Sequence, residues 1–143
     1  MIDETKPHNT EIDELESLWS RIIGKLGNKK FEDYLRYYWN SQNKTVRKNQ
    51  LFKTIRNNIT NKEEVFKVIR DLDDTADLYI AIQDPESEYW NELTDVRNPL
   101  RELKLFQIKQ THSLLIAGYK NLEPKVFIKL VKTVAIISFR YNI

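Results

Sequence analysis

Three aspartates near the middle of the chain have the spacing of a magnesium-binding motif. Asp73-Asp74-Thr75-Ala76-Asp77 matches the pattern D-D-x-x-D. Carboxylates four residues apart lie on one face of a helix, so Asp73 and Asp77 can approach the same cation. Enzymes that use this pattern need a longer chain and a second acidic motif, and neither is present. We therefore expect a solvated acidic helix face here, and keep a small metal-dependent enzyme as an alternative.

The two histidines and three glycines indicate no other catalytic centre. His8 and His112 have no second histidine at the spacing of a zinc site. Gly24, Gly27 and Gly118 are too few to build a phosphate-binding loop, and no G-x-S-x-G motif occurs. We expect no catalytic residue, no cofactor and no metal ion in this chain, so it is not predicted to be an enzyme by itself.

A run of cations offers the best candidate for a binding surface. Its members are Lys44, Arg47, Lys48, Lys53 and Arg56. Several cations on one helix face would bind nucleic-acid phosphates without sequence preference and would bind less tightly at high salt. In a simpler interpretation the fold balances this charge internally. Residues 24–62 contain 10 basic and 2 acidic side chains, whereas residues 63–95 contain 2 basic and 11 acidic ones.

The overall composition is that of a soluble globular domain. The chain has 143 residues, of which 41% are hydrophobic and 31% charged, which is enough to bury one core. The 3 glycines and 4 prolines are too few for a turn-rich β fold. Cysteine is absent, the start lacks a secretory signal, and no uncharged run approaches a membrane span. We expect a cytoplasmic protein that has no membrane partner.

Apolar residues recur with a helical period along almost the whole chain. Residues 1–9 lack this period and are predicted to be a frayed lead-in. Thr60, followed by Glu63 and Glu64, predicts a capped helix start. Pro99 either begins a helix or kinks one. The predicted helices run from about Ile12 to Leu26, Phe31 to Asn40, Val46 to Ile59, Glu63 to Ile82, Leu93 to Phe106, Leu114 to Tyr119 and Pro124 to Tyr141.

The last of these helices, Pro124 to Tyr141, is apolar around most of its circumference. Its one polar stripe consists of Lys125, Lys129 and Lys132. Such a helix needs partners on several sides. We therefore predict one all-α domain over residues 1–143, a compact bundle of about six to seven helices around a buried C-terminal helix. Thr133 to Phe139 also fits a buried strand, but no second strand candidate exists to pair with it.

Three segments carry a resemblance to a known family. They read Phe31-x-x-x-Leu-Arg-Tyr-Tyr-Trp-Asn-Ser41, Val46-Arg-Lys-x-x-Leu-Phe52 and Leu130-Val-Lys-x-x-x-x-x-Ser-Phe-Arg-Tyr-Asn-Ile143. These segments resemble the helical middle region of the GmrSD-type restriction family, over about Ile12 to Ile143. In that family a ParB-like nucleotide-hydrolysing domain comes first, and an HNH nuclease domain ends many members. The catalytic motifs of both domains are missing here, so the resemblance implies an interior piece of a longer protein.

The resemblance implies a non-catalytic helical scaffold domain of a bacterial, modification-dependent restriction-type protein. Such a domain would position the flanking nuclease and nucleotidase domains of the same polypeptide. It would contact the DNA backbone through the basic run from Lys44 to Arg56. The alternative is a protein–protein interaction module that has no nucleic-acid role. Neither the residues nor the resemblance indicates an oligomeric state or a DNA specificity.

Overall fold

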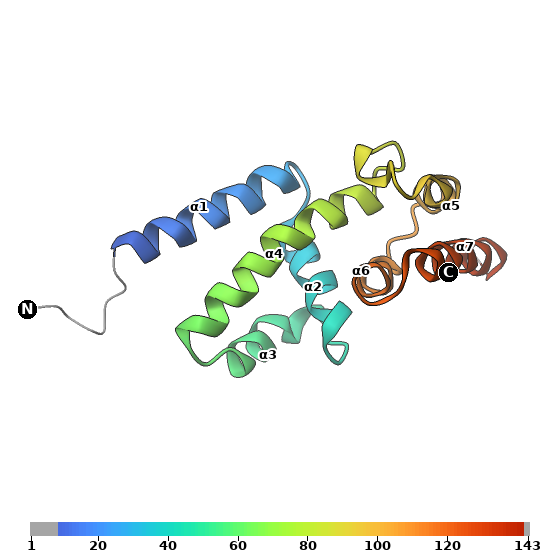
Figure 1. Ribbon diagram of the computed structural model, residues 1–143. Coiled ribbons are helices and arrows are strands. Elements are labelled where there is room, and N and C mark those ends of the chain that lie inside the picture. Colours follow the sequence, from blue (N-terminus) through green and yellow to red (C-terminus); the bar gives the residue numbers. More distant parts are fainter. Residues whose placement is uncertain (1–8, 142–143) are drawn as a thin grey trace, which may run out of the picture.

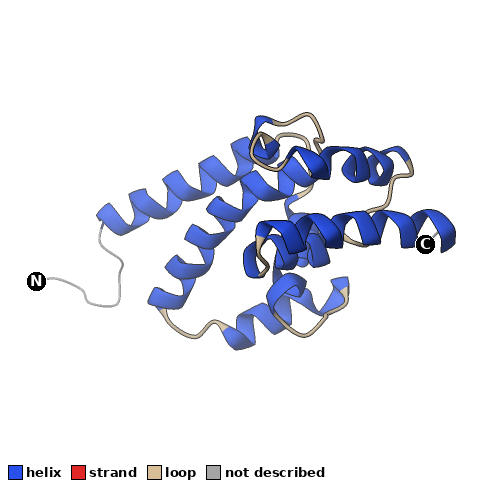
Figure 2. Cartoon of the chain, turned by 45° about the vertical axis from the view of Figure 1, so that its right-hand side comes forward, coloured by secondary structure: helices blue, strands red, loops and turns tan. Residues whose placement is uncertain are grey.

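Seven α-helices make up most of residues 9–141, the part of the chain that the computed structural model describes (Figure 1). They are α1 (Asn9–Leu26), α2 (Phe31–Gln42), α3 (Leu51–Asn58), α4 (Lys62–Ile82), α5 (Arg97–Leu105), α6 (His112–Asn121) and α7 (Pro124–Tyr141). Three 3-10 turns are η1 (Lys48–Gln50), η2 (Glu88–Trp90) and η3 (Thr94–Val96). Residues 9–141 contain no strand (Figure 2), so the predicted all-α class is confirmed, and residues 133–139 are helical. Of the predicted frayed lead-in, only Asn9 is described, and it begins α1.

Helix α4 is the central element of the fold. It contacts α1, α2, α6 and η2, and it passes through the middle of the molecule in Figure 1. Ion pairs join α1 to α4 in the same order along both helices, from Glu11 with Lys62 to Lys25 with Asp77. The two helices are therefore parallel neighbours over most of the length of α1.

The start of α4 differs slightly from the predicted capping box. Asn61, and not Thr60, is the N-cap residue, and its Oδ1 accepts a hydrogen bond from the Glu64 backbone N–H at 2.9 Å. The Glu64 carboxylate in turn accepts a bond from the Thr60 N–H at 2.9 Å. The N-cap bond of a capping box is therefore present at Asn61, whereas the return bond from Glu64 goes to the N–H of Thr60, one residue before the N-cap.

The aromatic helix α2 forms a wall of the core. Tyr34, Leu35, Tyr38 and Trp39 are buried. The Tyr34 hydroxyl donates a hydrogen bond to the Leu72 carbonyl of α4 at 2.5 Å. A buried phenol needs such a partner, so this bond ties α2 to the central helix.

Helix α7 is not enclosed on several sides, and the prediction of a buried C-terminal helix at the centre was wrong in this respect. One stripe of α7 packs on α5, α6 and η3. The buried members of that stripe are Phe127, Val131, Val134, Ala135 and Ser138. The side chains of Ile136 and Phe139 are 55% and 65% exposed. The partners of α7 therefore cover one side of the helix, and an apolar side remains open.

The acidic connection between α4 and α5 is anchored by a tryptophan. Trp90 is completely buried, and its indole N–H donates a hydrogen bond to the Ala81 carbonyl at 2.7 Å. The Trp90 ring also stacks on Phe127 of α7, with 6.2 Å between the ring centroids. Residues 84–95 carry several carboxylates, but a buried aromatic side chain holds this connection in place. Trp90 fastens it to the end of α4 and to α7.

Candidate functional site

The three aspartates of the predicted metal motif do not form a shared site. Asp73 is buried, and its Oδ2 accepts a hydrogen bond from Arg21 Nη2 at 2.8 Å. Lys25 Nζ lies 3.1 Å from Asp73 Oδ1 and 3.1 Å from Asp77 Oδ2, while Asp74 is exposed. Burial disfavours the charged form of Lys25, but its hydrogen bonds to the two carboxylates outweigh this effect and raise its pKa.

These contacts give the acidic residues of α4 a structural role. The expected solvated acidic face is wrong for Asp73, because two cations from α1 neutralise it. Within residues 9–141, no group of three or more histidine, cysteine, aspartate or glutamate side chains is arranged to hold a metal ion. α1 and α4 each carry more acidic than basic residues, so these pairs do not test the balance between the basic residues 24–62 and the acidic residues 63–95. Among the described residues, Lys25 alone forms ion pairs across those two stretches, with Asp73 and Asp77.

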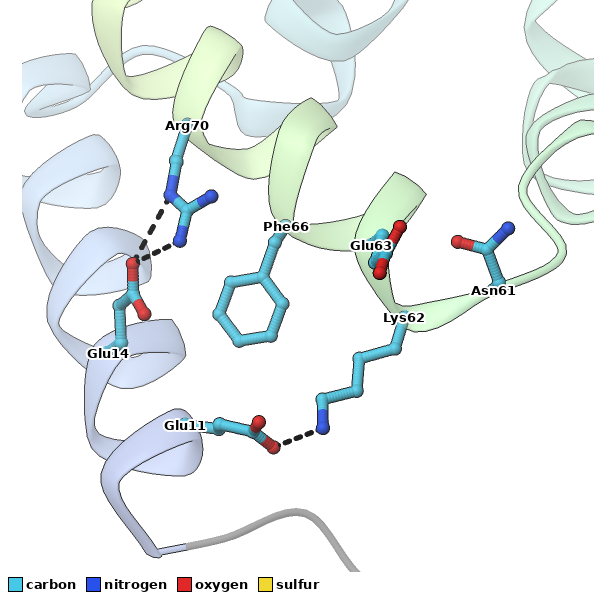
Figure 3. A pocket seen from close by; sticks show the side chains of 7 residues that line it. All are labelled: Glu11, Glu14, Asn61, Lys62, Glu63, Phe66 and Arg70. Carbon is cyan, nitrogen blue, oxygen red and sulfur yellow. Dashed lines mark hydrogen bonds and ion pairs between the residues drawn. The ribbon is translucent and has the colours of Figure 1, made fainter.

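The other end of the α1–α4 contact contains an open hollow of about 700 Å³ (Figure 3). Glu14 Oε1 accepts hydrogen bonds from Arg70 Nη2 and Nε at 2.7 and 3.2 Å. Glu11 pairs with Lys62, and the Phe66 ring lies between the two ion pairs. Because these opposite charges already satisfy each other across the hollow, it offers little net charge to attract a charged ligand.

The predicted basic run lies on the connection from α2 to α3 and on α3 itself. Lys44 and Arg47 belong to the connection, Lys48 begins η1, and Lys53 and Arg56 lie on α3. All five side chains are exposed, and none forms an ion pair with another described residue. No aspartate or glutamate occurs from residue 34 to residue 62. We call these five residues the basic segment.

The backbone of this region explains why the basic segment faces outward. Asn40 holds the connection, because its Oδ1 accepts a hydrogen bond from the Val46 N–H at 2.9 Å. Leu51 is buried and anchors the first turn of α3. The helix starts at Leu51 and not near Val46 as predicted, so only Lys53 and Arg56 share a helix face by spacing. Of the other three cations, Lys44 and Arg47 lie on the connection before α3 and Lys48 lies in the 3-10 turn η1.

A second basic region, which the sequence did not reveal, surrounds a cavity of about 280 Å³ beside α6. Lys29, Lys104 and Lys109 contribute to its wall. Their numbers are far apart, and they come from the α1–α2 link, from α5 and from the α5–α6 link. Since no local motif connects them, only the folded arrangement shows that these lysines belong together.

His112, at the start of α6, lies on the wall of the same cavity. Its side chain is buried and meets the ring of Tyr37 edge to face, with 5.0 Å between ring centroids. Burial, together with the charges of Lys109 and Lys29, lowers the pKa of His112 to about 4. His112 is thus an uncharged core histidine at neutral pH, whereas His8 lies outside the described residues.

Comparisons of this chain with protein-family models, with curated proteins and with solved structures give no match. The resemblance to the GmrSD-type restriction family therefore stays a hypothesis. Among the helices within residues 9–141, none is both long and apolar enough to span a membrane.

Proposed function

We propose that this chain is a non-catalytic helical scaffold domain of a bacterial cytoplasmic restriction-type protein, and that its basic segment binds the phosphate backbone of DNA. One observation supports this proposal most strongly. The five exposed cations from Lys44 to Arg56 have no ion-pair partner among the described residues, whereas Arg21, Lys25 and Arg70 pair with carboxylates in the fold. Cations that the fold does not neutralise are available to a polyanion.

The chemistry of these cations favours contacts with the backbone over contacts with base edges. Lys44 and Arg47 lie on an irregular connection, Lys48 begins the 3-10 turn η1, and α3 is only 8 residues long. A lysine or arginine that meets a phosphate releases condensed counterions from DNA, and this release gives affinity without sequence preference. Five such contacts would give a slope of about −4.5 in a plot of log binding constant against log salt concentration.

The test is a fluorescence-anisotropy titration of a short labelled DNA duplex over a series of salt concentrations. The combined change Arg47→Glu, Lys48→Glu and Lys53→Glu should abolish binding at low salt, because three attractive contacts become repulsive. The matched control reverses the same number of exposed charges on α7, at Lys125, Lys129 and Lys132. Equal binding by both variants and the parent chain would contradict the DNA proposal.

A specific observation also favours the interaction module as a second candidate function. Apolar side chains that are largely exposed gather on α7 and on the end of α5. They are Leu105, Phe106, Ile136, Phe139 and Tyr141. The rings of Phe106 and Phe139 meet edge to face at 5.4 Å between centroids, so the two helices share this surface. Exposed apolar patches of this kind mark docking surfaces, and here the proposed partner is a flanking domain of the same polypeptide.

Substitution of this surface distinguishes the two functions. The double change Ile136→Ser and Phe139→Ser should weaken association with the flanking domains in a co-purification assay and leave DNA binding unchanged. The charge reversals in the basic segment should have the opposite pattern. If the serine variant still co-purifies with those domains at the parent level, the docking role of α7 is wrong.

A further inference from the structure

The cavity beside α6 has a wall that combines positive charge with apolar surface. Three lysines contribute to it, namely Lys29, Lys104 and Lys109, and no aspartate or glutamate does. None of these lysines forms an ion pair within the described part of the chain. The apolar part of the wall consists of Ile82, Leu103, Ile108 and Leu115. The cavity is thus suited to a ligand that has one anionic end and one apolar end.

A helix terminus explains how two of the lysines reach one cavity. At the end of α5, Ile108 N–H donates to the Leu103 carbonyl at 2.9 Å and Gln107 N–H donates to the Lys104 carbonyl at 3.0 Å. This pair of bonds is the Schellman motif, and Gln107 takes its left-handed position with φ 55°. The motif turns the chain back, so that Lys104 and Lys109 line the same cavity from either side of the turn.

Two buried polar atoms on the same wall lack a partner, which is an observation independent of the lysines. His112 is only 6% exposed, and its Nδ1 has no hydrogen-bond partner among residues 9–141. Thr111 Oγ1 is also buried without one, and this side chain does not cap α6 although Thr111 is the N-cap residue. An unpaired buried polar group is costly, so a ligand that displaces a neighbouring side chain and accepts a hydrogen bond from the Thr111 hydroxyl, or from His112 in its Nδ1–H tautomer, would be stabilised by supplying the missing partner.

The first turn of α6 adds to the positive character of the cavity. α6 has 10 residues, and its first residue, His112, and its N-cap, Thr111, both lie on the wall. The N-terminus of a helix carries a partial positive charge, which favours anions. The His112 N–H already donates to the Lys109 carbonyl at 3.1 Å, so the terminus contributes this charge and not a free donor at His112. The lysines, the helix terminus and the unpaired atoms of Thr111 and His112 all point to the same chemistry.

We propose that this cavity binds a small organic anion whose carboxylate or phosphate group lies among Lys29, Lys104 and Lys109. A short apolar body would contact Leu103 and Ile108. The volume of about 280 Å³ lies just below the usual range for ligand pockets, so the ligand is small. This proposal is independent of DNA binding by the basic segment, since the two share no residue.

The test is a two-dimensional amide NMR titration of the whole chain with hexanoate and, separately, with inorganic phosphate. Hexanoate has both the charge and the apolar body, whereas phosphate has the charge alone. We expect saturable shifts at Gln107, Ile108, Thr111 and His112 with hexanoate, and weaker shifts at the same amides with phosphate. Binding of phosphate without binding of hexanoate would overturn the apolar half of the proposal.

Matched variants show whether the lysines are responsible. The double change Lys104→Ala and Lys109→Ala should weaken hexanoate binding at least tenfold, while Lys125→Ala with Lys129→Ala, an equal loss of exposed charge on α7, should not. A circular-dichroism spectrum shows that each variant keeps its helices. Absence of saturable shifts in the parent chain, or equal binding by both variants, would overturn the proposal. Displacement of hexanoate by a short DNA duplex would instead assign the cavity to nucleic-acid phosphate and refute the small-ligand reading.

Discussion

Helices α4 and α7 are both long and rich in apolar residues, yet the fold uses them differently. α4 has 21 residues and carries Asp71, Asp73, Asp74 and Asp77, and it is nevertheless the central helix. α7 has 18 residues and no acidic residue, and it still leaves an apolar side exposed. The position of a helix in this fold thus depends on how many neighbours reach it and on whether its charges find partners.

The two helices differ in what surrounds them along the chain. α4 has elements on both sides in sequence, and α1, α2 and α6 all contact it. Arg21 and Lys25 of α1 meet Asp73, so a buried carboxylate is compatible with that position. α7 packs on α5, α6 and η3, which together cover only one face.

The largest effect should come from the two phenylalanines of α7. Phe127 is 1% exposed and lies against Trp90 and Tyr119, whereas Phe139 is 65% exposed. Phe127→Ala should lower the free energy of unfolding by about 3 to 5 kcal/mol, because it leaves a cavity in the core. Phe139→Ala should cost less than about 1 kcal/mol. Chemical denaturation measures both, and equal losses would contradict the one-sided packing of α7.

The second effect concerns His112, which contacts Tyr79 of α4 at 5.8 Å between ring centroids. The pKa of His112 is about 4 in the folded chain, whereas the ordinary pKa of histidine, which applies in the unfolded chain, is 6.5. Between pH 4 and pH 6.5 the unfolded chain therefore binds more protons than the folded chain. The contribution of uncharged His112 to the free energy of unfolding is therefore fully present above pH 6.5 and is lost as the pH falls toward 4. The loss amounts to about 3 kcal/mol.

The change His112→Phe isolates this contribution, because it keeps a ring but cannot be protonated. Between pH 7 and pH 4, the free energy of unfolding of the parent chain should fall by about 3 kcal/mol more than that of the variant. The measurement is chemical denaturation of both proteins at several pH values. Parallel stability curves would show that His112 is not held uncharged in the folded chain.

The third effect compares two adjacent aspartates of α4. Asp73→Ala should lower the free energy of unfolding by about 1 to 3 kcal/mol, since Arg21 and Lys25 lose a buried partner. Asp74 is exposed, so Asp74→Ala should change stability by less than about 0.5 kcal/mol. Both changes alter helix propensity equally, which makes Asp74 a matched control. Similar values for the two variants in denaturation would mean that the Asp73 contacts contribute nothing.

The smallest effect is expected in the basic segment. Each of the changes Arg47→Glu and Lys53→Glu should alter the free energy of unfolding by less than about 0.5 kcal/mol, because neither cation has an ion-pair partner among the described residues. Thermal and chemical denaturation would measure this. A loss comparable to that of Asp73→Ala would show that these cations stabilise the fold.

The sequence predicted the helices well where a clear apolar period coincided with a boundary signal. The end of α1 near Gly27 and the start of α7 at Pro124 are examples. It predicted the position of α7 poorly, because periodicity shows which residues are apolar and not how many neighbours will cover them.

The contacts that form the candidate sites were harder to predict, because they join residues that are far apart in the sequence. Arg21 and Asp73 are 52 residues apart, and nothing local in the sequence pairs them. Lys29 is separated from Lys104 by an even longer stretch, so the cavity beside α6 depends on tertiary packing alone. The basic segment could be found because its residues are close in sequence. The conformation of the basic segment could not be predicted. Asn40 hydrogen-bonds to Val46 within the connection, and α3 begins only at Leu51.

The buried Trp90 gives the molecule a built-in optical reporter. Trp19 is 46% exposed, whereas Trp90 is completely enclosed between the end of α4 and Phe127 of α7. With Trp19 and Trp39 replaced by phenylalanine, the emission of the remaining indole would report on the junction of the two helices by itself. Detachment of α7 would expose this indole to water and shift its emission to longer wavelength.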